Sequence, residues 1–482
     1  MIARVDSSLR KDTVVYGAAT LAERLASLLL LPLLTKTLPP ELYGVWSQIV
    51  VSAGISVSIL LLGLNTAAVH FLAGLEDSRG QRAVAHAMLA LVLGNAAVVI
   101  LLTLLLTDAL SRLLFGDPVF ARFVRLIGVF WAEEALFELL TAVVRARRKI
   151  SRLSMYYVIK NALRLISLAV GLIVLRVSLV EAVWLMVLFQ FVLIVGIYWI
   201  EIGGPGREKR LWRAPRWREI MVFALPLVPY NMLVWVNNFS DRYIVLHVLD
   251  LRRMSIYAVA YSLAAIGGLV YSVLGFVLYP YLAERWNAGD RAGAAEMLRT
   301  TTHTYVALFV PFLTLLVMLR TPITQILATR DYLANPAVVL ALGVGIGLFG
   351  LYQLNLYTTL LAGKMPANFA ILTVATVVNL TLNLTLVSRL DIFGAALATV
   401  VSNATLAIPT VVVSRRALPY AFSWRSAARI AAAALVMAAF LFVARSALNV
   451  GNILILAAVA ILSFAIYASL GLLRFHAAPG RP

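Results

Sequence analysis

The sequence predicts an all-α polytopic membrane protein. Of the 482 residues, 62% are hydrophobic and only 13% are charged, and the mean hydropathy is +0.93. Soluble globular domains carry about 25% charged residues, and apolar runs this frequent are typical of helices that cross a bilayer. The chain contains no cysteine, which excludes disulfides, thiolate metal sites and cysteine catalysis.

Apolar runs long enough to cross a bilayer number roughly fourteen. They lie at about 14–36, 43–73, 84–106, 120–144, 154–175, 179–200, 220–248, 255–282, 302–320, 336–361, 368–388, 393–413, 428–444 and 452–473. The short polar N-terminus is followed by no small-residue cleavage site, so the first run is expected to be a retained helix. The connections are short, so no soluble domain is expected on either side.

The distribution of basic residues predicts the topology. Lys and Arg total 41 against 22 Asp and Glu, a net charge of +19. If the N-terminus is cytoplasmic, about twenty-six of the 41 basic residues lie in cytoplasmic segments. The two most basic loops, Arg145–Arg152 and Arg207–Arg218, are among them. The basic excess is therefore a topology signal and an attraction to anionic lipid, and no nucleic-acid partner is expected. Both termini are predicted to be cytoplasmic.

The chain also repeats itself. The pattern G-x-R-A-x-A-x-x-M-L occurs at Gly80–Leu89 and again at Gly289–Leu298, after the second and eighth spans. Acid–base pairs lie inside the first and seventh spans. We therefore predict two six-helix lobes in parallel orientation around a central cleft, residues 1–206 and 207–424, followed by two helices and a tail in 425–482. Repeats of this kind hold a substrate between the halves and rock around it, which indicates a transporter.

One polar helix face in the seventh span is a candidate substrate-binding surface. Asn231, Trp235, Asn238 and Arg242 recur at helical spacing, and Asp241 precedes Arg242. A charge at membrane depth costs about 2.5–3.5 kcal/mol on insertion scales, so it normally faces protein or a water-filled cavity. The pair is either an internal salt bridge between helices or a cationic contact for an anionic substrate. The same two interpretations apply to Glu23 and Arg24 in the first span.

A second charged group lies in the fourth and fifth spans. Glu134 and Glu138 face one side of the fourth, and Lys160 and Arg164 face one side of the fifth. Consecutive spans are antiparallel, and matched depths predict the ion pairs Glu138–Lys160 and Glu134–Arg164. The alternative is a proton or cation relay through the two glutamates, or an anion contact by Arg164.

Other polar residues indicate packing. Asn379 and Asn383, one turn apart in the eleventh span, either form hydrogen bonds between helices or line the second lobe, and packing is the expected role. The sequence contains no metal-binding or catalytic motif, so no metal, cofactor or catalytic residue is expected.

Several segments together resemble one transporter family. They are Leu25–Ser47, Asn237–Val245, Ile256–Ser262, Gly363–Ile371 and Asn379–Asn403. Over roughly residues 12–415 the sequence is similar to the Wzx-type oligosaccharide (polysaccharide) flippases of the multidrug/oligosaccharidyl-lipid/polysaccharide exporter superfamily.

The resemblance implies a function. Such flippases move an undecaprenyl-pyrophosphate-linked oligosaccharide from the inner to the outer leaflet of the bacterial cytoplasmic membrane. They serve lipopolysaccharide or exopolysaccharide synthesis beside a polymerase and glycosyltransferases. Their cleft tends to be cationic, which implies pyrophosphate contacts by Arg24 and Arg242, then by Arg164 and Lys160. Glu23, Glu134, Glu138 and Asp241 are candidates for ion coupling. Together with Glu133, these acids inside the predicted spans nearly balance the basic residues there. In this respect the sequence departs from the strongly positive cleft that the family implies.

Three alternatives remain. A lipid II flippase also has fourteen helices and a cationic cleft. A multidrug antiporter of the same superfamily usually has twelve helices and an acidic cleft. A membrane polysaccharide polymerase needs a sizeable outward loop, whereas the longest outward connections here, near 107–120 and 320–336, are only about fifteen residues.

Overall fold

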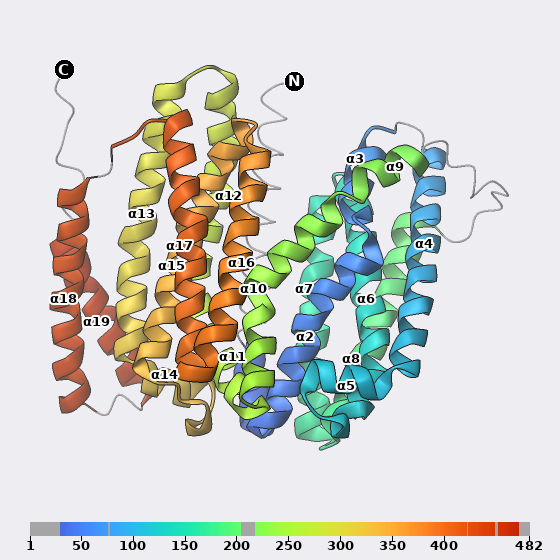
Figure 1. Ribbon diagram of the computed structural model, residues 1–482, viewed down its shortest axis with the longest axis horizontal. Coiled ribbons are helices and arrows are strands. Elements are labelled where there is room, and N and C mark those ends of the chain that lie inside the picture. Colours follow the sequence, from blue (N-terminus) through green and yellow to red (C-terminus); the bar gives the residue numbers. More distant parts are fainter. Residues whose placement is uncertain (1–28, 76–77, 204–216, 422, 449–451, 472–482) are drawn as a thin grey trace. The chain divides into compact units, whose positions relative to one another are not determined.

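The computed structural model describes residues 29–75, 78–203, 217–421, 423–448 and 452–471. All regular secondary structure in these residues is helical (Figure 1). Eleven of the described helices are long and apolar enough to cross a membrane, or twelve if one bent pair counts as a single span. The chain is therefore an all-α polytopic membrane protein, as predicted. The first predicted span is described only from residue 29, so the count of fourteen stays a prediction.

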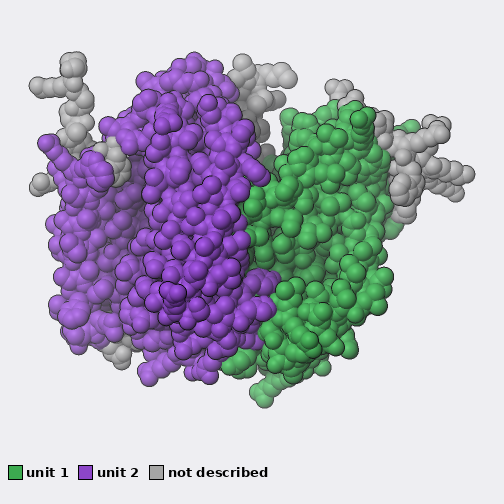
Figure 2. Space-filling view, viewed as in Figure 1, with its two compact units in different colours: residues 1–239 green, residues 240–482 purple. Residues whose placement is uncertain are grey.

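The chain divides into two compact units, residues 1–239 and 240–482 (Figure 2). The division falls inside helix α10, later than the predicted lobe boundary at 206/207. The helices that begin in the first unit are α2 (Pro40–Leu61), α3 (Leu64–Ala73), α4 (Ser78–Leu105), α5 (Thr107–Phe115), η1 (Pro118–Phe120), α6 (Ala121–Ala146), α7 (Ile150–Ala169), η2 (Val170–Val174), α8 (Leu179–Ile197), η3 (Tyr198–Ile202), α9 (Trp217–Ala224) and α10 (Leu227–Val248).

Helix α6 forms the core of the first unit. It contacts α2, α3, α4, α7 and α8, and most of its residues are buried. Phe123, Phe130 and Phe137, two turns apart from one another, are fully buried and form one continuous stripe. Neighbouring helices thus cover α6 on most of its sides. The glutamates of α6 therefore lie inside the protein rather than in lipid.

The predicted span at 43–73 is wrong as a single helix. It is broken into α2 and α3 at Leu62 and Gly63, whose φ angles are +49° and +79°. A Cβ at Gly63 would lie 2.3 Å from the Ala224 carbonyl oxygen, so α9 approaches too closely for any side chain there.

Two other predicted spans are also interrupted. The span at 220–248 changes from α9 to α10 around Pro226, which has no N–H to continue the helical hydrogen bonds. The span at 255–282 bends by 41° between α11 (Leu251–Ala265) and α12 (Gly268–Asn287). The lengths of the apolar runs therefore predicted these spans, but not the interruptions inside them.

The second unit is built around α15, which contacts α11, α12, α13 and α17. Its remaining elements are α13 (Arg291–Met318), α14 (Arg320–Leu327), η5 (Arg330–Tyr332), α15 (Pro336–Leu361), α16 (Met365–Leu390), α17 (Ile392–Ala417), α18 (Trp424–Ala447) and α19 (Ile453–Gly471). Helices α18 and α19 pack on α13 through buried Met437, Leu441 and Tyr467. The Tyr467 hydroxyl donates to the Ala307 carbonyl oxygen at 2.9 Å, which fixes α19 to α13.

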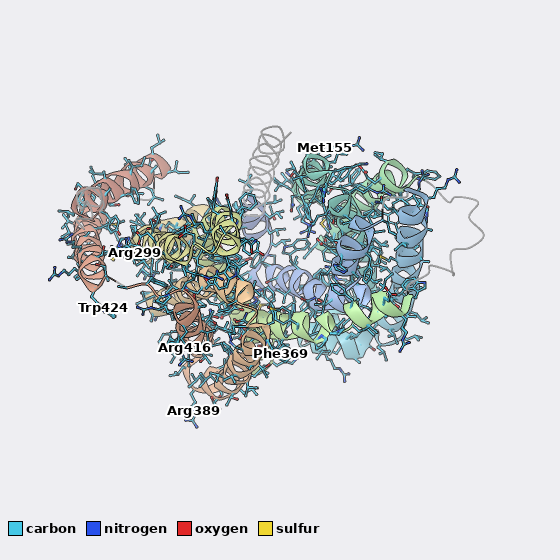
Figure 3. All side chains as sticks on the ribbon, turned by 90° about the horizontal axis from the view of Figure 1, so that it is seen from above. Met155, Arg299, Phe369, Arg389, Arg416 and Trp424 are labelled. Carbon is cyan, nitrogen blue, oxygen red and sulfur yellow. The ribbon has the colours of Figure 1, made fainter. Side chains whose placement is uncertain are left out.

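Large apolar side chains cover much of the outer surface. Met155 is 48% exposed, Phe369 is 44% exposed and Trp424 is 79% exposed (Figure 3). Exposed apolar side chains on helices of spanning length are typical of a lipid-facing surface.

Candidate functional site

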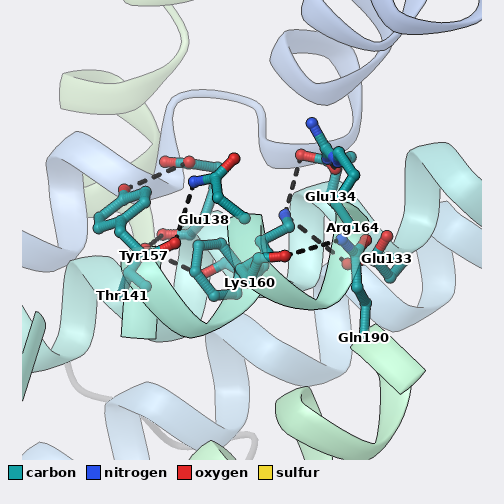
Figure 4. Close-up of polar contacts among 10 residues, drawn as sticks. Glu133, Glu134, Glu138, Thr141, Tyr157, Lys160, Arg164 and Gln190 are labelled. Atoms are coloured by element: carbon teal, nitrogen blue, oxygen red, sulfur yellow. Dashed lines mark hydrogen bonds and ion pairs between the residues drawn. The ribbon is translucent and has the colours of Figure 1, made fainter. Parts of the chain in front are cut away.

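Buried charged side chains gather where α6, α7 and α8 meet in the first unit (Figure 4). We call Glu133, Glu134, Glu138, Lys160 and Arg164 the charge cluster. Glu134 and Glu138 on α6 lie about one turn apart, as do Lys160 and Arg164 on α7, so helical spacing places each pair on one face of its helix. The cluster contains all four residues predicted for the fourth and fifth spans and adds Glu133.

Glu134 lies at the centre of the charge cluster. Its Oε2 accepts a hydrogen bond from the Lys160 ammonium at 2.9 Å, and its Oε1 accepts one from the Arg164 guanidinium. The side chains of Lys160 and Arg164 are only 6% and 15% exposed. The predicted Glu134–Arg164 ion pair is therefore confirmed, and the two cations share one carboxylate.

Glu133 is not among the residues predicted for the site, yet it is the most buried acid of the cluster. Its side chain is 1% exposed, and its Oε1 lies 3.6 Å from the Lys160 ammonium. Neither carboxylate oxygen accepts a hydrogen bond from the described residues. Gln190 of α8 lies nearby and donates to the Lys160 carbonyl oxygen at 3.3 Å. A buried carboxylate held by one cation alone is poorly stabilised, which makes Lys160 the critical partner.

The predicted ion pair between Glu138 and Lys160 is wrong. Within the described residues Glu138 accepts a hydrogen bond from the Tyr157 hydroxyl at 3.3 Å, whereas Lys160 reaches Glu134 and Glu133. The Lys160 ammonium also lies 4.0 Å from the centre of the Phe137 ring, a cation–π contact that stabilises it beside Glu133 and Glu134. The backbone depth of Lys160 matches that of Glu138. The long lysine side chain nevertheless extends to Glu134, one helical turn away along α6.

The charge cluster has one acid more than it has bases. Its three carboxylates face the cations Lys160 and Arg164, and Arg145 is a third basic side chain beside Glu138 in the adjoining pocket. Glu138 is the acid next to open space. It lines a pocket of about 330 Å³ together with His70, Arg145 and Phe223. Glu138 is therefore the acid of the charge cluster that a proton or cation entering this pocket would reach.

Helical spacing predicted that the polar face of α10 is a substrate-binding surface, but one of its residues, Trp235, takes part in helix packing instead. The Trp235 indole donates to the Val51 carbonyl oxygen at 2.8 Å, which ties α10 to α2. Asn231 and Asn238 are half-buried. Their side chains form no hydrogen bond in the described part of the chain. Of this face, only the Trp235 indole N–H is therefore bonded in packing among the three residues Asn231, Trp235 and Asn238 within the described part of the chain.

Asp241 and Arg242 contact different partners in the second unit. The Tyr257 hydroxyl of α11 donates to Asp241 Oδ2 at 2.5 Å, and the Arg242 backbone N–H donates to Oδ1 at 2.8 Å. The Arg242 guanidinium lies 4.8 Å from the centre of the Tyr261 ring. Both side chains are buried, so tyrosines of α11 support both members of the pair.

Asn379 takes part in packing, as predicted. It accepts a hydrogen bond from Ser240 at 3.1 Å, and Asn383 donates to it one turn along α16. Glu23 and Arg24 lie outside the described residues. Among the residues that the structure describes, no group of His, Cys, Asp and Glu could hold a metal ion.

Two protein-family models match the sequence. The model described as polysaccharide biosynthesis protein matches residues 9–286, which is more than half of the chain. The MatE model matches residues 226–385. A search among curated protein sequences finds no match.

Solved structures with a similar fold include a lipid II flippase and two transporters. The lipid II flippase MurJ in an inward closed conformation is 16% identical, with a TM-score of 0.76 over 95% of this chain and 98% of that one. An inward-facing multidrug resistance MATE family transporter is 16% identical, with a TM-score of 0.66 over 84% and 97%. A MOP superfamily transporter from Pyrococcus furiosus is 16% identical, with a TM-score of 0.54 over 84% and 94%. At these identities the similarity shows the shared fold.

Proposed function

The chain belongs to the polysaccharide biosynthesis protein family, and we propose that it is a flippase for an undecaprenyl-pyrophosphate-linked oligosaccharide. In this proposal the substrate moves from the cytoplasmic to the outer leaflet of the bacterial cytoplasmic membrane. The observation that carries the proposal is the family match over residues 9–286 in a chain whose membrane helices bury a network of ionisable side chains. The product is used for cell-surface polysaccharide, beside a polymerase and glycosyltransferases.

We propose alternating access as the mechanism. The pyrophosphate and the first sugars enter a cleft between two lobes, 1–206 and 207–424, while the lipid tail stays in the bilayer. The lobes then rock, and the headgroup leaves on the outer side. Both termini stay cytoplasmic. No covalent chemistry is required, so the protein acts as a transporter and not as an enzyme.

Arg24 and Arg242 are the proposed pyrophosphate contacts. Arginine suits this role because its planar guanidinium forms paired hydrogen bonds with phosphate oxygens. Asn231 and Asn238 are the proposed sugar contacts, because amides both donate and accept hydrogen bonds. Lys160 and Arg164 are less available to a substrate, since each is bonded to Glu134.

We further propose that the charge cluster couples transport to protons. Protonation of Glu138 makes the net charge of the cluster more positive by one, while its other neighbours, Arg145 and Tyr157, remain in place. Glu134 holds Lys160 and Arg164 in position while Glu138 titrates. Glu23 and Asp241 are the corresponding candidates in the first and seventh spans.

A lipid II flippase is the second candidate. The observation that favours it is the fold similarity to MurJ, which extends over nearly the full length of both chains. A multidrug antiporter is favoured less, because the MATE family transporter is similar over 84% of this chain.

Reconstitution distinguishes these candidates. Purified protein is placed in vesicles that contain either undecaprenyl-pyrophosphate oligosaccharide or lipid II, and membrane-impermeant periodate reports sugars that reach the outer leaflet. We expect faster exposure of the oligosaccharide than in protein-free vesicles, and no such gain for lipid II. The reverse preference would make the protein a lipid II flippase. No gain with either substrate would refute both assignments.

A further inference from the structure

A second charged site lies at the end of the first unit where α4 and α7 begin and where α6 and η3 end. A pocket of about 540 Å³ opens there. The residues that line it are Gln81, Arg82, Arg147, Lys149, Ile200, Glu201, Ile202 and Gly203. We call it the basic pocket. It is separate from the charge cluster, and all of its residues belong to the first unit.

Glu201 organises the base of this pocket. Its side chain is 1% exposed, and its carboxylate contacts the Lys149 ammonium at 2.7 Å and the Arg152 guanidinium at 3.0 Å. The Tyr156 hydroxyl donates to the same carboxylate at 2.9 Å, and Arg147 donates to the Glu201 backbone carbonyl. The carboxylate of Glu201 therefore holds two basic side chains, and its backbone carbonyl holds a third at the same place.

The pocket keeps a positive excess after Glu201 is satisfied. Four basic side chains surround one carboxylate, and Arg82 and Arg147 form no ion pair with any described carboxylate. Burial lowers the pKa of Arg147; the Glu201 carboxylate raises this pKa, and the neighbouring Arg82 guanidinium lowers it further. Two guanidiniums that repel each other beside an open cavity are stabilised by an anion between them.

The rim of the basic pocket is apolar. Ile200 lines the pocket and is 64% exposed, and the adjacent Trp199 is 58% exposed. Both belong to η3, a π-helix that ends the membrane-length segment Leu179–Ile202. Tyr198 of the same turn packs against His86 of α4 and fixes this wall. Exposed tryptophan at the end of a span is typical of the membrane–water interface.

We propose that the basic pocket binds the phosphate of an anionic phospholipid headgroup from the bilayer. Arg82 and Arg147 contact the phosphate, while Ile200 and Trp199 lie against the upper part of the acyl chains. A cationic floor beside an apolar rim fits a lipid better than a soluble anion, which needs no rim. The predicted topology places this end at the cytoplasmic leaflet. This site is additional to the transport cleft, and its test does not depend on transport activity.

Lipid binding to the purified full chain tests the proposal. Native mass spectrometry counts phosphatidylglycerol bound during titration, with phosphatidylcholine as the zwitterionic comparison. The test variant carries Arg82→Gln and Arg147→Gln. Arg148→Gln is the matched control, because Arg148 is an exposed neighbour that does not line the pocket. A further variant, Arg82→Lys with Arg147→Lys, keeps the charge if the glutamine variant does not fold.

We expect one phosphatidylglycerol molecule to bind to each chain, and we expect phosphatidylcholine not to displace it. The glutamine variant should bind it roughly 20- to 30-fold more weakly, about five-fold for each lost charge. The Arg148→Gln control should change binding less than about two-fold, and the lysine variant should weaken binding less than the glutamine variant.

Several results would overturn the assignment. Equal binding of phosphatidylcholine would show that the site does not select an anionic lipid. Equal losses of binding in the glutamine variant and the control would show that diffuse surface charge, and not the pocket, attracts the lipid. If both pocket variants bind like the unmodified chain, the pocket holds no lipid. Displacement by inorganic pyrophosphate at equal concentration would make the ligand a soluble anion. Tighter binding of undecaprenyl pyrophosphate would make the pocket a loading site for the transported lipid.

Discussion

Lys160→Met tests whether the charge cluster is held together by one ammonium. The Lys160 side chain is 6% exposed, and it is the sole cation within 4 Å of Glu133 among the described residues. The methionine fills similar space but leaves Glu133 without a cation and Glu134 with Arg164 alone. Removing one partner of a buried ion pair costs about 3–5 kcal/mol, because the other charge stays buried. We therefore expect a large loss of stability without a large change in packing.

The assay is thermal unfolding of the purified protein. In a unit of this size about 1 kcal/mol lowers Tm by roughly 2–4 °C, so Lys160→Met should lower Tm by roughly 6–20 °C. Adding Glu133→Gln removes the unbalanced acid and should restore at least half of that loss. The control Arg148→Met, at an exposed position, should shift Tm by less than about 2 °C. A Tm for Lys160→Met as high as that of the control, or no recovery with Glu133→Gln, would refute the reasoning.

The remaining predictions concern transport and packing. Glu138→Gln should abolish the acceleration of oligosaccharide flipping by a proton gradient in vesicles, because glutamine cannot take up and release a proton; an unchanged gradient response would show that Glu138 has no part in coupling. Arg242→Lys should retain part of the flipping rate and Arg242→Ala should lose it, since lysine keeps the charge but not the paired hydrogen bonds; equal rates in both variants would make Arg242 structural. Trp235→Phe loses the hydrogen bond to the Val51 carbonyl and should cost about 1 kcal/mol, or roughly 2–4 °C in Tm, with flipping kept near that of the unmodified chain. A larger loss of flipping than of stability would return Trp235 to the substrate site.

The sequence predicted where helices lie but not where they break. The apolar run at 336–361 corresponds to α15, Pro336–Leu361, because hydropathy and length are enough to predict the position of an uninterrupted membrane helix. The run at 43–73 breaks at Gly63, where the Ala224 carbonyl leaves no room for a Cβ. That contact joins residues 161 positions apart, and a glycine inside an apolar run equally fits close helix packing.

The sequence predicted the contacts of the candidate site that follow from local helix geometry, but not those that depend on tertiary packing. Helical spacing and antiparallel order brought Glu134 to Arg164, since both positions follow from local geometry. They did not decide between Glu138 and Glu133 as partners of Lys160, because a flexible side chain made that choice. Glu201 was not predicted at all. Its partners Lys149 and Arg152 lie about fifty positions earlier in the chain, and only the packing of α7 beside α8 brings them together.

Mass spectrometry of lipid-linked glycans from cells depleted of this protein tests the flippase assignment most directly. The proposed function predicts that one undecaprenyl-pyrophosphate oligosaccharide accumulates on the inner leaflet while lipid II stays at its normal level. Accumulation of lipid II instead, or no change in any lipid-linked intermediate, would contradict it.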